Sequence, residues 1–282
     1  MTCALYVERY GRAGEVGADI GTVDLEDSVP APAREEARRL ALPFFMEARG
    51  AGGADGWLRT LRINNLRSAD GLRDILALVE SGARPPALLV PKVDSAQDLL
   101  ILEELLQERL PSTIFLVVIE TAAGLAAVDE IAAATPRVRA LVFGGADFSA
   151  DLGTTMEWEH LLYARSRILV AAARAGIPAM DSPCFEIRNA EALRSEILRS
   201  QRLGFAGKAA VHPRQVALIN EGFTPAPEAV RRARRILASI EERGGQIVVL
   251  DGEMIGPPAV IAARRMLALA ERIEAVEKTV RV

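Results

Sequence analysis

The sequence has few of the features that mark exported, disulfide-linked or membrane-spanning proteins. It contains only two cysteines, Cys3 and Cys184, which are too few for a disulfide framework and lack the paired spacing of a zinc site. No run approaches the roughly 18 uncharged residues that a membrane-spanning helix needs, and the start lacks the basic and apolar segments of a signal peptide. We therefore expect a cytoplasmic protein with no membrane partner.

The chain also lacks an excess of basic residues. It has 34 Lys and Arg against 38 Asp and Glu, a formal net charge of -4, and no basic tail or stripe. Nucleic acid is therefore not an expected partner, because binding a phosphate backbone requires concentrated positive charge. Half of the 282 residues are hydrophobic and 26% are charged, which predicts a globular chain long enough for one large core.

Short apolar or β-branched segments alternate along the chain with longer segments of helical periodicity. The apolar segments are 4–7, 22–25, 58–63, 87–90, 114–119, 140–143, 177–180 and 205–211. The helical segments include 33–48, 95–110, 161–175 and 190–203. Eight such units predict an α/β protein with a (β/α)8 TIM barrel, and an open doubly wound sheet is the alternative. Polar residues follow nearly every apolar segment, which favours the barrel because its strand ends meet at one mouth.

The last sixty residues follow a different pattern. Residues 223–227 read as a linker, 228–242 as an Arg-rich amphipathic helix, 251–258 as a turn-rich stretch and 257–278 as a longer helix. We expect a TIM-barrel catalytic domain over 1–222 and a C-terminal helical extension over 223–282. The extension would pack on its own barrel or form a lid over a neighbouring subunit.

Two carboxylates follow neighbouring strands of the predicted barrel. Glu120 comes directly after IFLVVI, and Asp147 follows LVF and two glycines. Two acids at one mouth, with no His or Cys near them in sequence, suit a hard cation such as Mg²⁺, which usually takes one or two protein carboxylates and keeps waters. The alternative is that Glu120 caps a helix and Asp147 belongs to a turn.

A basic side chain and an acidic cluster lie at the ends of two earlier strands. Arg62 and Asn64 end the third strand, where a guanidinium can hold a substrate carboxylate through two parallel hydrogen bonds. An ordinary solvated or ion-paired arginine is the alternative. VDLEDSV places Asp24, Glu26 and Asp27 within four residues, and a buried member needs a partner such as Arg62 or metal-bound water. Asp27 would otherwise simply open the next helix.

Other polar residues are weaker candidates for chemistry. GKAAVHP places Lys208 and His212 near the eighth strand, where His212 would act as a general base or, as we favour, as a structural hydrogen-bonding group. Cys184 has no histidine near it in sequence, so we do not expect a nucleophile. The glycine-rich stretch at 144–153 matches neither a dinucleotide fingerprint nor a Walker motif.

Six motifs, taken together, resemble the citrate lyase beta-subunit-like family. They are DLEDSV (24–29), LRIN (61–64), VPK (90–92), IET (119–121), FGGADFSADLG (143–153) and GFAGKAAVHPRQ (204–215). The family belongs to the HpcH/HpaI aldolase superfamily of Mg²⁺-dependent enzymes, which also includes malyl-CoA and citramalyl-CoA lyases. The resemblance implies a (β/α)8 barrel in a homotrimer or hexamer and reversible carbon–carbon cleavage of a small carboxylated β-hydroxyacyl thioester.

The resemblance also implies roles for individual residues. Glu120 and Asp147 would hold Mg²⁺, with Mn²⁺ as an alternative, and Arg62 would orient the substrate carboxylate, so these three form the implied catalytic set. Further residues near the substrate would be Asn64, Lys92, Gly145 and Ala146. The acidic cluster Asp24, Glu26 and Asp27 would support the metal ligands.

Two departures from the family pattern widen the functional alternatives. The tail reads DGEMIGPP, with Gly256 where related lyases have a proton-transferring aspartate, so Asp251, Glu253 or a barrel residue would have to substitute. The amino end lacks the Arg-Ser and Pro-Gly pairs that help to hold coenzyme A in the family. An acyl-carrier-protein thioester, thioester hydrolysis, an aldol reaction on a free 2-oxo or hydroxy acid, and a non-catalytic barrel subunit are the alternatives.

Overall fold

Eight short strands form one parallel sheet whose order follows the chain, β1 to β8. The computed structural model describes residues 1–46, 57–244 and 246–280. The strands are β1 (Thr2–Cys3), β2 (Ile20–Asp24), β3 (Leu58–Arg62), β4 (Ala87–Val90), β5 (Ile114–Ile119), β6 (Val138–Phe143), β7 (Ala179–Asp181) and β8 (Gly207–Lys208). This sequential order confirms the (β/α)8 class, because a doubly wound sheet reverses its strand order partway across. Among the described strands no pairing joins β8 to β1, so the curled sheet has no hydrogen-bonded seam.

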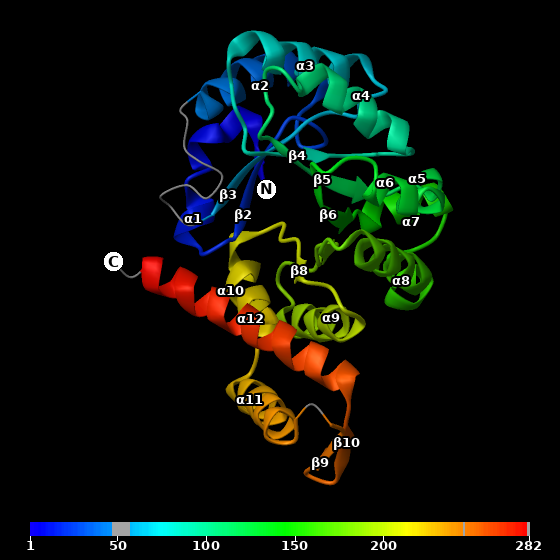
Figure 1. The fold of residues 1–282 in the computed structure, drawn as a ribbon. Helices are drawn as coiled ribbons and strands as arrows, with labels where there is room; N and C mark the ends of the chain where they lie inside the picture. The colour runs from blue at the N-terminus through cyan, green and yellow to red at the C-terminus, as the bar shows by residue number, and fades with distance from the viewer. Residues whose placement is uncertain (47–56, 245, 281–282) are drawn as a thin grey trace. The chain divides into compact units, whose positions relative to one another are not determined.

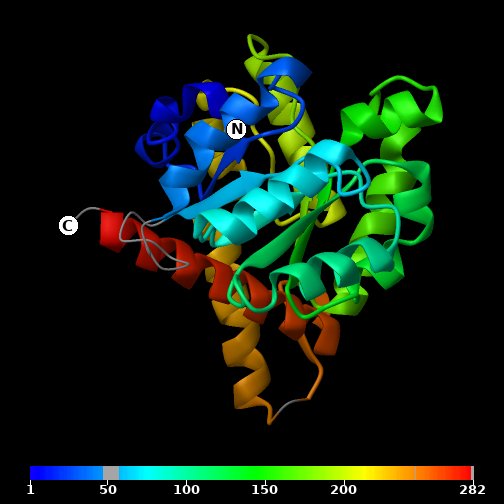
Figure 2. The same ribbon diagram turned by 90° about the horizontal axis from the view of Figure 1, so that it is seen from above.

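Helices follow most strands and cover the outside of the sheet. They are α1 (Arg12–Glu15), α2 (Arg34–Ala41), α3 (Ala69–Ser81), α4 (Ala96–Leu106), α5 (Ala122–Ala126), α6 (Val128–Ala132), α7 (Gly145–Leu152), α8 (Trp158–Ala175), α9 (Ala190–Leu203) and α10 (Pro213–Phe223), with 3-10 turns η1 (Ala4–Arg9), η2 (Ala31–Ala33) and η3 (Leu42–Phe45). Figures 1 and 2 show α2, α3 and α4 together on the outer side of β2 to β4. The predicted helices at 161–175 and 190–203 correspond to α8 and α9, and the one at 95–110 to the shorter α4.

Local sequence signals set the ends of several helices. Ser68 caps α3 by accepting a hydrogen bond from the Gly71 N–H, and Gly82 ends it with a φ of 77°. Ser95 and Asp98 form a capping box at the start of α4. These signals fix where each helix begins, and therefore which residues remain in the loops beyond the strands.

The prediction of a strand at 4–7 was wrong. Only Thr2 and Cys3 pair with β2, and the next six residues form η1. The periodicity of a short apolar segment does not distinguish a helix from a strand. The turn brings Tyr10 into the core, where its hydroxyl donates to the Gly21 carbonyl at 2.7 Å and its ring meets the Trp57 ring edge-on.

The predicted helix at 33–48 is shorter than expected. It ends as α2 at Ala41 and continues as the 3-10 turn η3, which contains Pro43. Proline lacks the N–H that an α-helix needs and crowds the preceding turn, which accounts for the change. Residues 47 and 48 lie outside the described residues.

Alternate side chains of the strands form the barrel interior. The buried cluster contains Ala87, Leu89, Leu116, Val118, Ala140 and Val142, and the side chains packed against it are Ile20, Leu58, Ile114 and Met180. Because strand side chains alternate between faces, the same inward rows continue at the carboxyl ends to Asp24, Arg62, Glu120 and Gly144. An apolar interior therefore leads to a polar end.

The chain divides into two compact units, Met1–Ile219 and Asn220–Val282. The second contains α11 (Pro227–Glu242), β9 (Val248–Leu250), β10 (Glu253–Ile255) and α12 (Pro257–Val280), with a core of Ala233, Ile236, Ile255 and Ala263. The hairpin β9–β10 replaces part of the stretch expected to be turns only. Asp251 and Gly252, with φ of 51° and 82°, form its two-residue loop, as Asp-Gly commonly does.

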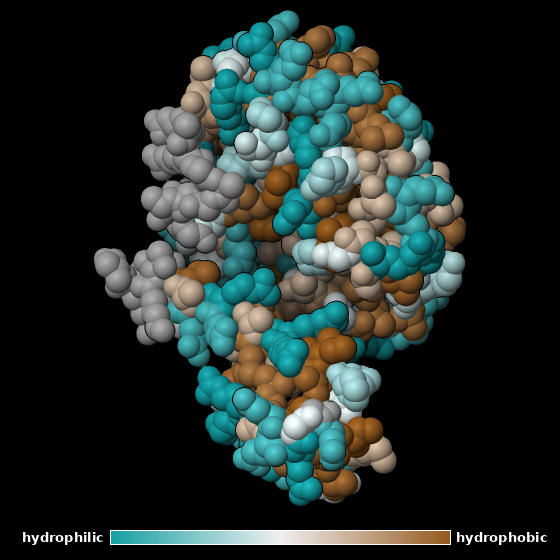
Figure 3. Space-filling model, viewed as in Figure 1, coloured by the Kyte–Doolittle hydropathy of each residue, from teal (hydrophilic) through white to brown (hydrophobic). Residues whose placement is uncertain are grey.

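The surface of the second unit carries apolar side chains on its hairpin. Val249 and Met254 are cross-strand partners and are 74% and 78% exposed. Figure 3 shows brown, hydrophobic surface among teal, hydrophilic surface at the bottom of the view, where this hairpin lies. None of the described helices combines the length and apolar character needed to cross a membrane.

Candidate active site

Arg62 is the centre of an ion-pair cluster at the ends of β2 and β3. Its Nε and Nη2 atoms lie 2.6 and 2.8 Å from the two carboxylate oxygens of Asp24, the residue beside it in the sheet register. Its Nη1 atom lies 2.9 Å from Glu26 Oε2 and 3.2 Å from Asp27 Oδ2. The bidentate contact fixes the plane of the guanidinium, so three of the acids selected from the sequence surround one arginine.

Burial and charge act in opposite directions on this cluster. Burial raises the pKa of Asp24, but the hydrogen bonds and charge of Arg62 outweigh it, and the net pKa lies below the usual value. Burial dominates for Glu26 and raises its pKa, although Arg62 and Lys92 oppose the change. The Arg62 guanidinium stays charged because its acidic neighbours outweigh its own desolvation.

Lys92 links this cluster to Glu120 and Asp147. Its backbone N–H donates to Glu120 Oε1 at 2.9 Å. Its Nζ atom lies 2.6 Å from Glu26 Oε1, 3.4 Å from Asp27 Oδ1 and 3.7 Å from Asp147 Oδ1. The structure therefore brings the two carboxylates that follow β5 and β6 to the same lysine.

Glu120 is buried in a region of concentrated negative charge. Its residue is 3% exposed, and burial, followed by the charges of Glu26 and Asp147, raises its pKa to about 8, while Lys92 lowers it. A nearby cation strongly stabilises the charged form of a carboxyl group that is buried among other negative charges. This observation fits a metal ligand better than a helix cap, because Thr121 rather than Glu120 caps α5.

Two glycines leave the room that this arrangement needs. A Cβ atom on Gly144 would lie 2.3 Å from Glu120 Oε2 and 2.5 Å from the Cβ of Glu120. A Cβ atom on Gly145 would lie 2.8 Å from Ser182 Oγ. Asp147 follows in the first turn of α7, with its side chain 43% exposed. The sequence motifs predict no role for Gly144, although a glycine pair directly after a strand is a signal of close packing.

Gly145 and Ala146 begin helix α7. The first N–H groups of an α-helix have no partner within the helix, and they carry partial positive charge. Asn64 is placed differently. Its side-chain amide donates to the Leu25 carbonyl at 3.0 Å and to Asp74 Oδ2 at 2.9 Å, so both amide hydrogens are used within the protein.

A second buried network lies under α8 and α9. Lys208 Nζ lies 3.2 Å from Asp181 Oδ2, 2.8 Å from Glu196 Oε2 and 2.7 Å from the Ser182 carbonyl oxygen. Arg165 Nε donates to Asp181 Oδ1 at 2.9 Å. The expectation that all polar strand ends meet at one mouth was therefore wrong for Asp181 and Lys208. Strand alternation turns them toward the helices, as the partners from α8 and α9 show.

The contacts of His212 and the burial of Cys184 fit structural roles rather than catalytic ones. The Arg214 backbone N–H donates to His212 Nδ1 at 3.1 Å, a local contact at the start of α10. Cys184 is buried, and burial raises the pKa of its thiol, which disfavours the nucleophilic thiolate.

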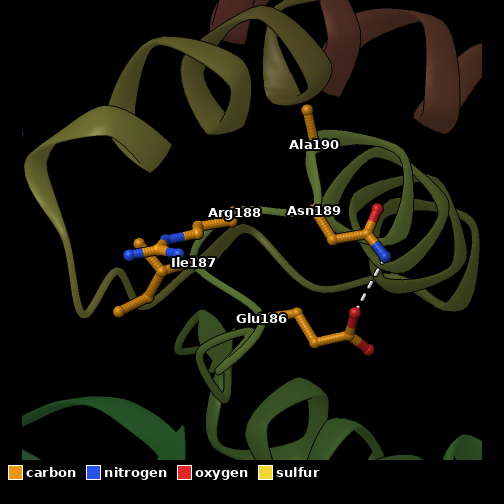
Figure 4. Close-up of a pocket in the computed structure, with 5 residues that line it drawn as sticks. All are labelled: Glu186, Ile187, Arg188, Asn189 and Ala190. Atoms are coloured by element: carbon orange, nitrogen blue, oxygen red, sulfur yellow. Dashed lines mark hydrogen bonds between the residues drawn. The ribbon is translucent and has the colours of Figure 1, made fainter.

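A surface hollow is lined by five residues at the end of the β7–α9 loop and the start of α9, and it contains none of the Arg62–Lys92 cluster. Figure 4 shows its lining residues, Glu186, Ile187, Arg188, Asn189 and Ala190, with the Asn189 amide directed at Glu186. That amide donates to Glu186 Oε2 at 2.8 Å. The hollow is therefore a local feature of this loop and the start of α9, separate from the Arg62–Lys92 cluster.

The candidate substitutes for the missing tail aspartate are engaged with arginines of α11. Arg235 Nη2 lies 2.6 Å from Asp251 Oδ1, and Arg232 Nη2 lies 2.5 Å from Glu253 Oε2. These pairs are partly exposed, and they hold the hairpin against α11. Gly256 lies between β10 and α12.

The donor set at the barrel end suits a divalent ion with oxygen ligands. Over residues 1–46, 57–244 and 246–280, no group of three or more His, Cys, Asp and Glu side chains is arranged to hold a metal. Mg²⁺ commonly takes only one or two carboxylates and completes its shell with waters and substrate oxygens. Glu120 and Asp147 therefore fit this ion.

Comparison with known proteins identifies the family. The model of the HpcH/HpaI aldolase/citrate lyase family matches residues 10–213. L-malyl-CoA/beta-methylmalyl-CoA lyase of Cereibacter sphaeroides is 35% identical over 92% of this chain and 89% of that protein. The crystal structure of RipC from Yersinia pestis is 40% identical, with a TM-score of 0.71 over 82% of this chain and 95% of that one.

A third relative was solved with ligands. CitE of Mycobacterium tuberculosis, in complex with magnesium, acetoacetate and coenzyme A, is 28% identical, with a TM-score of 0.79 over 95% of this chain and 96% of that one. These matches confirm the resemblance inferred from the six motifs. The chain belongs to the HpcH/HpaI aldolase/citrate lyase family.

Proposed function

We propose that this protein is a Mg²⁺-dependent carbon–carbon lyase, or aldolase, that cleaves or forms a small carboxylated β-hydroxyacyl thioester of the citryl-, malyl- or citramalyl-CoA kind. One observation carries the proposal: Glu120 and Asp147 meet at Lys92 beside Arg62. Family membership and the malyl-CoA lyase relative support the reaction class.

Glu120 and Asp147 are the proposed ligands of Mg²⁺, with Mn²⁺ as an alternative ion. The metal ion would supply Lewis-acid stabilisation of charge on the carboxylate and adjacent oxygen of the substrate. Magnesium in the CitE complex supports this assignment. Asp24, Glu26 and Asp27 would act indirectly, because they hold Arg62 and Lys92 at the site.

The proposed substrate contacts are positive groups around the metal ligands. The N–H groups of Gly145 and Ala146, at the start of α7, would donate to the substrate carboxylate. Lys92 and Arg62 would stabilise negative charge on substrate oxygens. Arg62 would do so through the second hydrogen of Nη2, because Nε and the other Nη2 hydrogen face Asp24 and Nη1 faces Glu26 and Asp27. Asn64 would keep the β3 end in place.

Cleavage requires two proton movements. The β-hydroxyl group loses its proton as the carbon–carbon bond breaks and its electrons pass to the thioester enolate, and the enolate then takes a proton at its α-carbon. Gly256 can transfer no proton. Asp251 and Glu253 are the proposed substitutes, and their pairs with Arg235 and Arg232 would have to open for them to act.

Coenzyme A is the thiol that we favour. Its presence in the CitE complex and the name of the malyl-CoA lyase relative support it. An acyl-carrier-protein thioester is the alternative, because the amino end lacks the family's Arg-Ser and Pro-Gly pairs.

We further propose a cytoplasmic homotrimer or hexamer in which residues 223–282 form a lid over a neighbouring barrel. The separate core of the second unit and the exposed Val249–Met254 pair support an extension with a docking role. The two free cysteines suit a reducing compartment.

Light scattering tests the proposed assembly. It should give a mass at least three times that of the 30.3 kDa chain, and a monomer would contradict the assembly.

The activity test uses a panel of hydroxyacyl-CoA thioesters and measures release of glyoxylate, pyruvate, oxaloacetate or acetoacetate. We expect metal-dependent release that EDTA abolishes and Mg²⁺ restores, and loss of activity in Glu120→Ala. The matched control is Glu104→Ala, at an acid on the outer helix α4. Activity that survives both the chelator and Glu120→Ala would reject the proposal.

A second candidate is thioester hydrolysis or aldol chemistry on a free 2-oxo acid, which Gly256 favours because the usual proton-transfer group is absent. Thiol release without carbon–carbon cleavage in the same panel would establish hydrolysis. Turnover of the free acid without any thioester would establish the aldol reaction.

A further inference from the structure

The Lys92 backbone has an unusual conformation in which its N–H contacts Glu120. Its φ angle is 51°, in the left-handed region that residues with side chains rarely adopt. In this conformation the Lys92 N–H donates to Glu120 Oε1 at 2.9 Å. Residues kept in this region at the end of a strand are commonly tied to function, because surrounding contacts must hold them there.

The Lys92 side chain also lies close to acids of the proposed site. Its ammonium group lies 2.6 Å from Glu26 Oε1 and 3.7 Å from Asp147 Oδ1, and the side chain is 27% exposed. Glu26 is itself 5% exposed at its side chain, so its charge is poorly screened by water. The Lys92 ammonium group therefore lies beside Glu26, which it shares with Arg62, and near the proposed ligand Asp147, while the Lys92 N–H contacts the other proposed ligand, Glu120.

We propose that Lys92 is a positioning residue with two separable effects on the metal site. Its backbone N–H orients Glu120, and its ammonium group balances the acids before a metal ion binds and thereby weakens the affinity for that ion. The inference rests on the proposed function. It follows from Coulomb's law, because a positive charge at this range repels a divalent ion held by Glu120 and Asp147.

The test is the affinity of the metal-free, full-length protein for Mn²⁺, measured by titration calorimetry without substrate. Lys92→Met should tighten binding by at least about tenfold, the change expected for one charge near a divalent ion even under water-like screening. Lys92→Arg keeps the charge and should bind Mn²⁺ much as the wild type does. Lys92→Gly accepts the left-handed φ and keeps the N–H, so it should also bind more tightly and guards against misfolding of Lys92→Met.

A double variant separates charge from structure. Glu26→Gln alone should weaken Mn²⁺ binding, and Glu26→Gln combined with Lys92→Met should bring the affinity back toward that of the wild type. Metal-free Lys92→Met should also have a lower Tm than the wild type and gain more from added Mn²⁺.

Two outcomes would overturn the inference in distinguishable ways. Unchanged or weaker Mn²⁺ binding in both Lys92→Met and Lys92→Gly, with binding lost in Glu120→Gln, would reject the role of Lys92 and leave the metal site in place. Wild-type Mn²⁺ affinity in Glu120→Gln would reject the metal site itself, and the inference with it.

Discussion

At the carboxyl end of β6, the missing side chain of Gly144 leaves the space that Glu120 fills. Glu120 Oε2 would lie 2.3 Å from a Cβ atom at position 144, closer than nonbonded atoms approach. Glu120 also accepts the Lys92 N–H, so it cannot move away without breaking that bond. The position of one proposed metal ligand therefore depends on a glycine at the end of the neighbouring strand.

The first prediction concerns this contact. In Gly144→Ala, Glu120 has to shift, and we expect lyase activity to fall about 100-fold, as misplacement of a catalytic group by ~1 Å can cause. Steady-state kinetics with the thioester that proves active in the panel measure the change. The control is Gly11→Ala, where no atom lies within 4 Å of the added Cβ and φ is -53°, and its activity should be unchanged. Full activity in Gly144→Ala would show that Glu120 needs no fixed position.

The sequence motifs predict most residues of this site, and the expectation that a buried acid of the 24–27 cluster pairs with Arg62 is confirmed. They do not predict which acid makes the bidentate contact. Glu120, Asp147 and Arg62 were identified from strand ends and family motifs. The bidentate Asp24–Arg62 contact depends on the register between β2 and β3, which no sequence pattern specifies. The left-handed φ of Lys92 was equally inaccessible, because lysine carries no signal for that conformation.

Among the elements, β7 and β8 are joined to α8 and α9 by buried charges rather than by apolar packing alone. Lys208 and Asp181 have side chains with no exposed surface, and Arg165 completes the group from α8. Short strands of three and two residues supply few ladder hydrogen bonds. The ion pairs therefore add specific contacts between this end of the sheet and its helices.

The second prediction is that Lys208→Met strongly lowers the free energy of unfolding. Removing one partner leaves the Asp181 charge buried with only part of its compensation, which typically costs about 3–5 kcal/mol. Urea unfolding followed by circular dichroism measures the loss. Arg39→Met, which breaks the exposed pair with Glu36, serves as the control and should change stability little. Equal effects of the two substitutions would contradict the structural role of Lys208.

The third prediction concerns acid unfolding. Burial raises the pKa of Asp181, but the charges of Lys208 and Arg165 and the hydrogen bonds of Ser200 and Arg165 outweigh it, so the folded pKa lies below the ordinary 3.8. The stabilisation is complete above that value and is lost as the pH falls through the folded pKa. The free energy of unfolding should therefore decline below about pH 4, and less steeply in Asp181→Asn. Asp24 has a pKa lowered in the same sense, so some decline should remain.

For the helices and strands, the sequence predicted the number of sheet strands better than it predicted where each element begins and ends. Eight strand segments were expected and eight strands form the parallel sheet, but the first lies at Thr2–Cys3 and the last spans only Gly207–Lys208. Pro43 broke a predicted helix, and Asp251-Gly252 made a hairpin where only turns were expected. The periodicity of apolar residues indicates which side chains are buried. The ends of helices and strands depend instead on single residues and on partners far away in sequence.

For the whole molecule, the family match lies in the first unit, and the tail has Gly256 where the resemblance implies an aspartate. Residues 10–213 match the family model, while Gly256 stands in the second unit, beyond that match. The proposed metal ligands Glu120 and Asp147, together with Arg62 and Lys92, all belong to the first unit. The proposed reaction class therefore rests on residues of the first unit, and the proposed rate of proton transfer would depend on the group that acts in place of the aspartate.

The fourth prediction is that Gly256→Asp raises lyase activity. A positioned acid–base group contributes typically ~10² to 10⁴-fold, so a gain toward the lower end is expected if an aspartate is the only missing part. The initial rate of thioester cleavage at saturating Mg²⁺ is the measurement, and Gly256→Asn is the control with similar size and no carboxylate. An unchanged rate in Gly256→Asp would mean that another group already transfers the proton.

The central claim is that Glu120 and Asp147 together hold one divalent ion at the end of the barrel. The most direct measurement is an anomalous difference map from crystals of the full chain soaked in Mn²⁺. We predict one strong peak within about 2.0–2.3 Å of a carboxylate oxygen of each residue, the range for oxygen ligands of small divalent ions. A fully occupied peak elsewhere, or no peak between these two side chains at saturating Mn²⁺, would contradict the account.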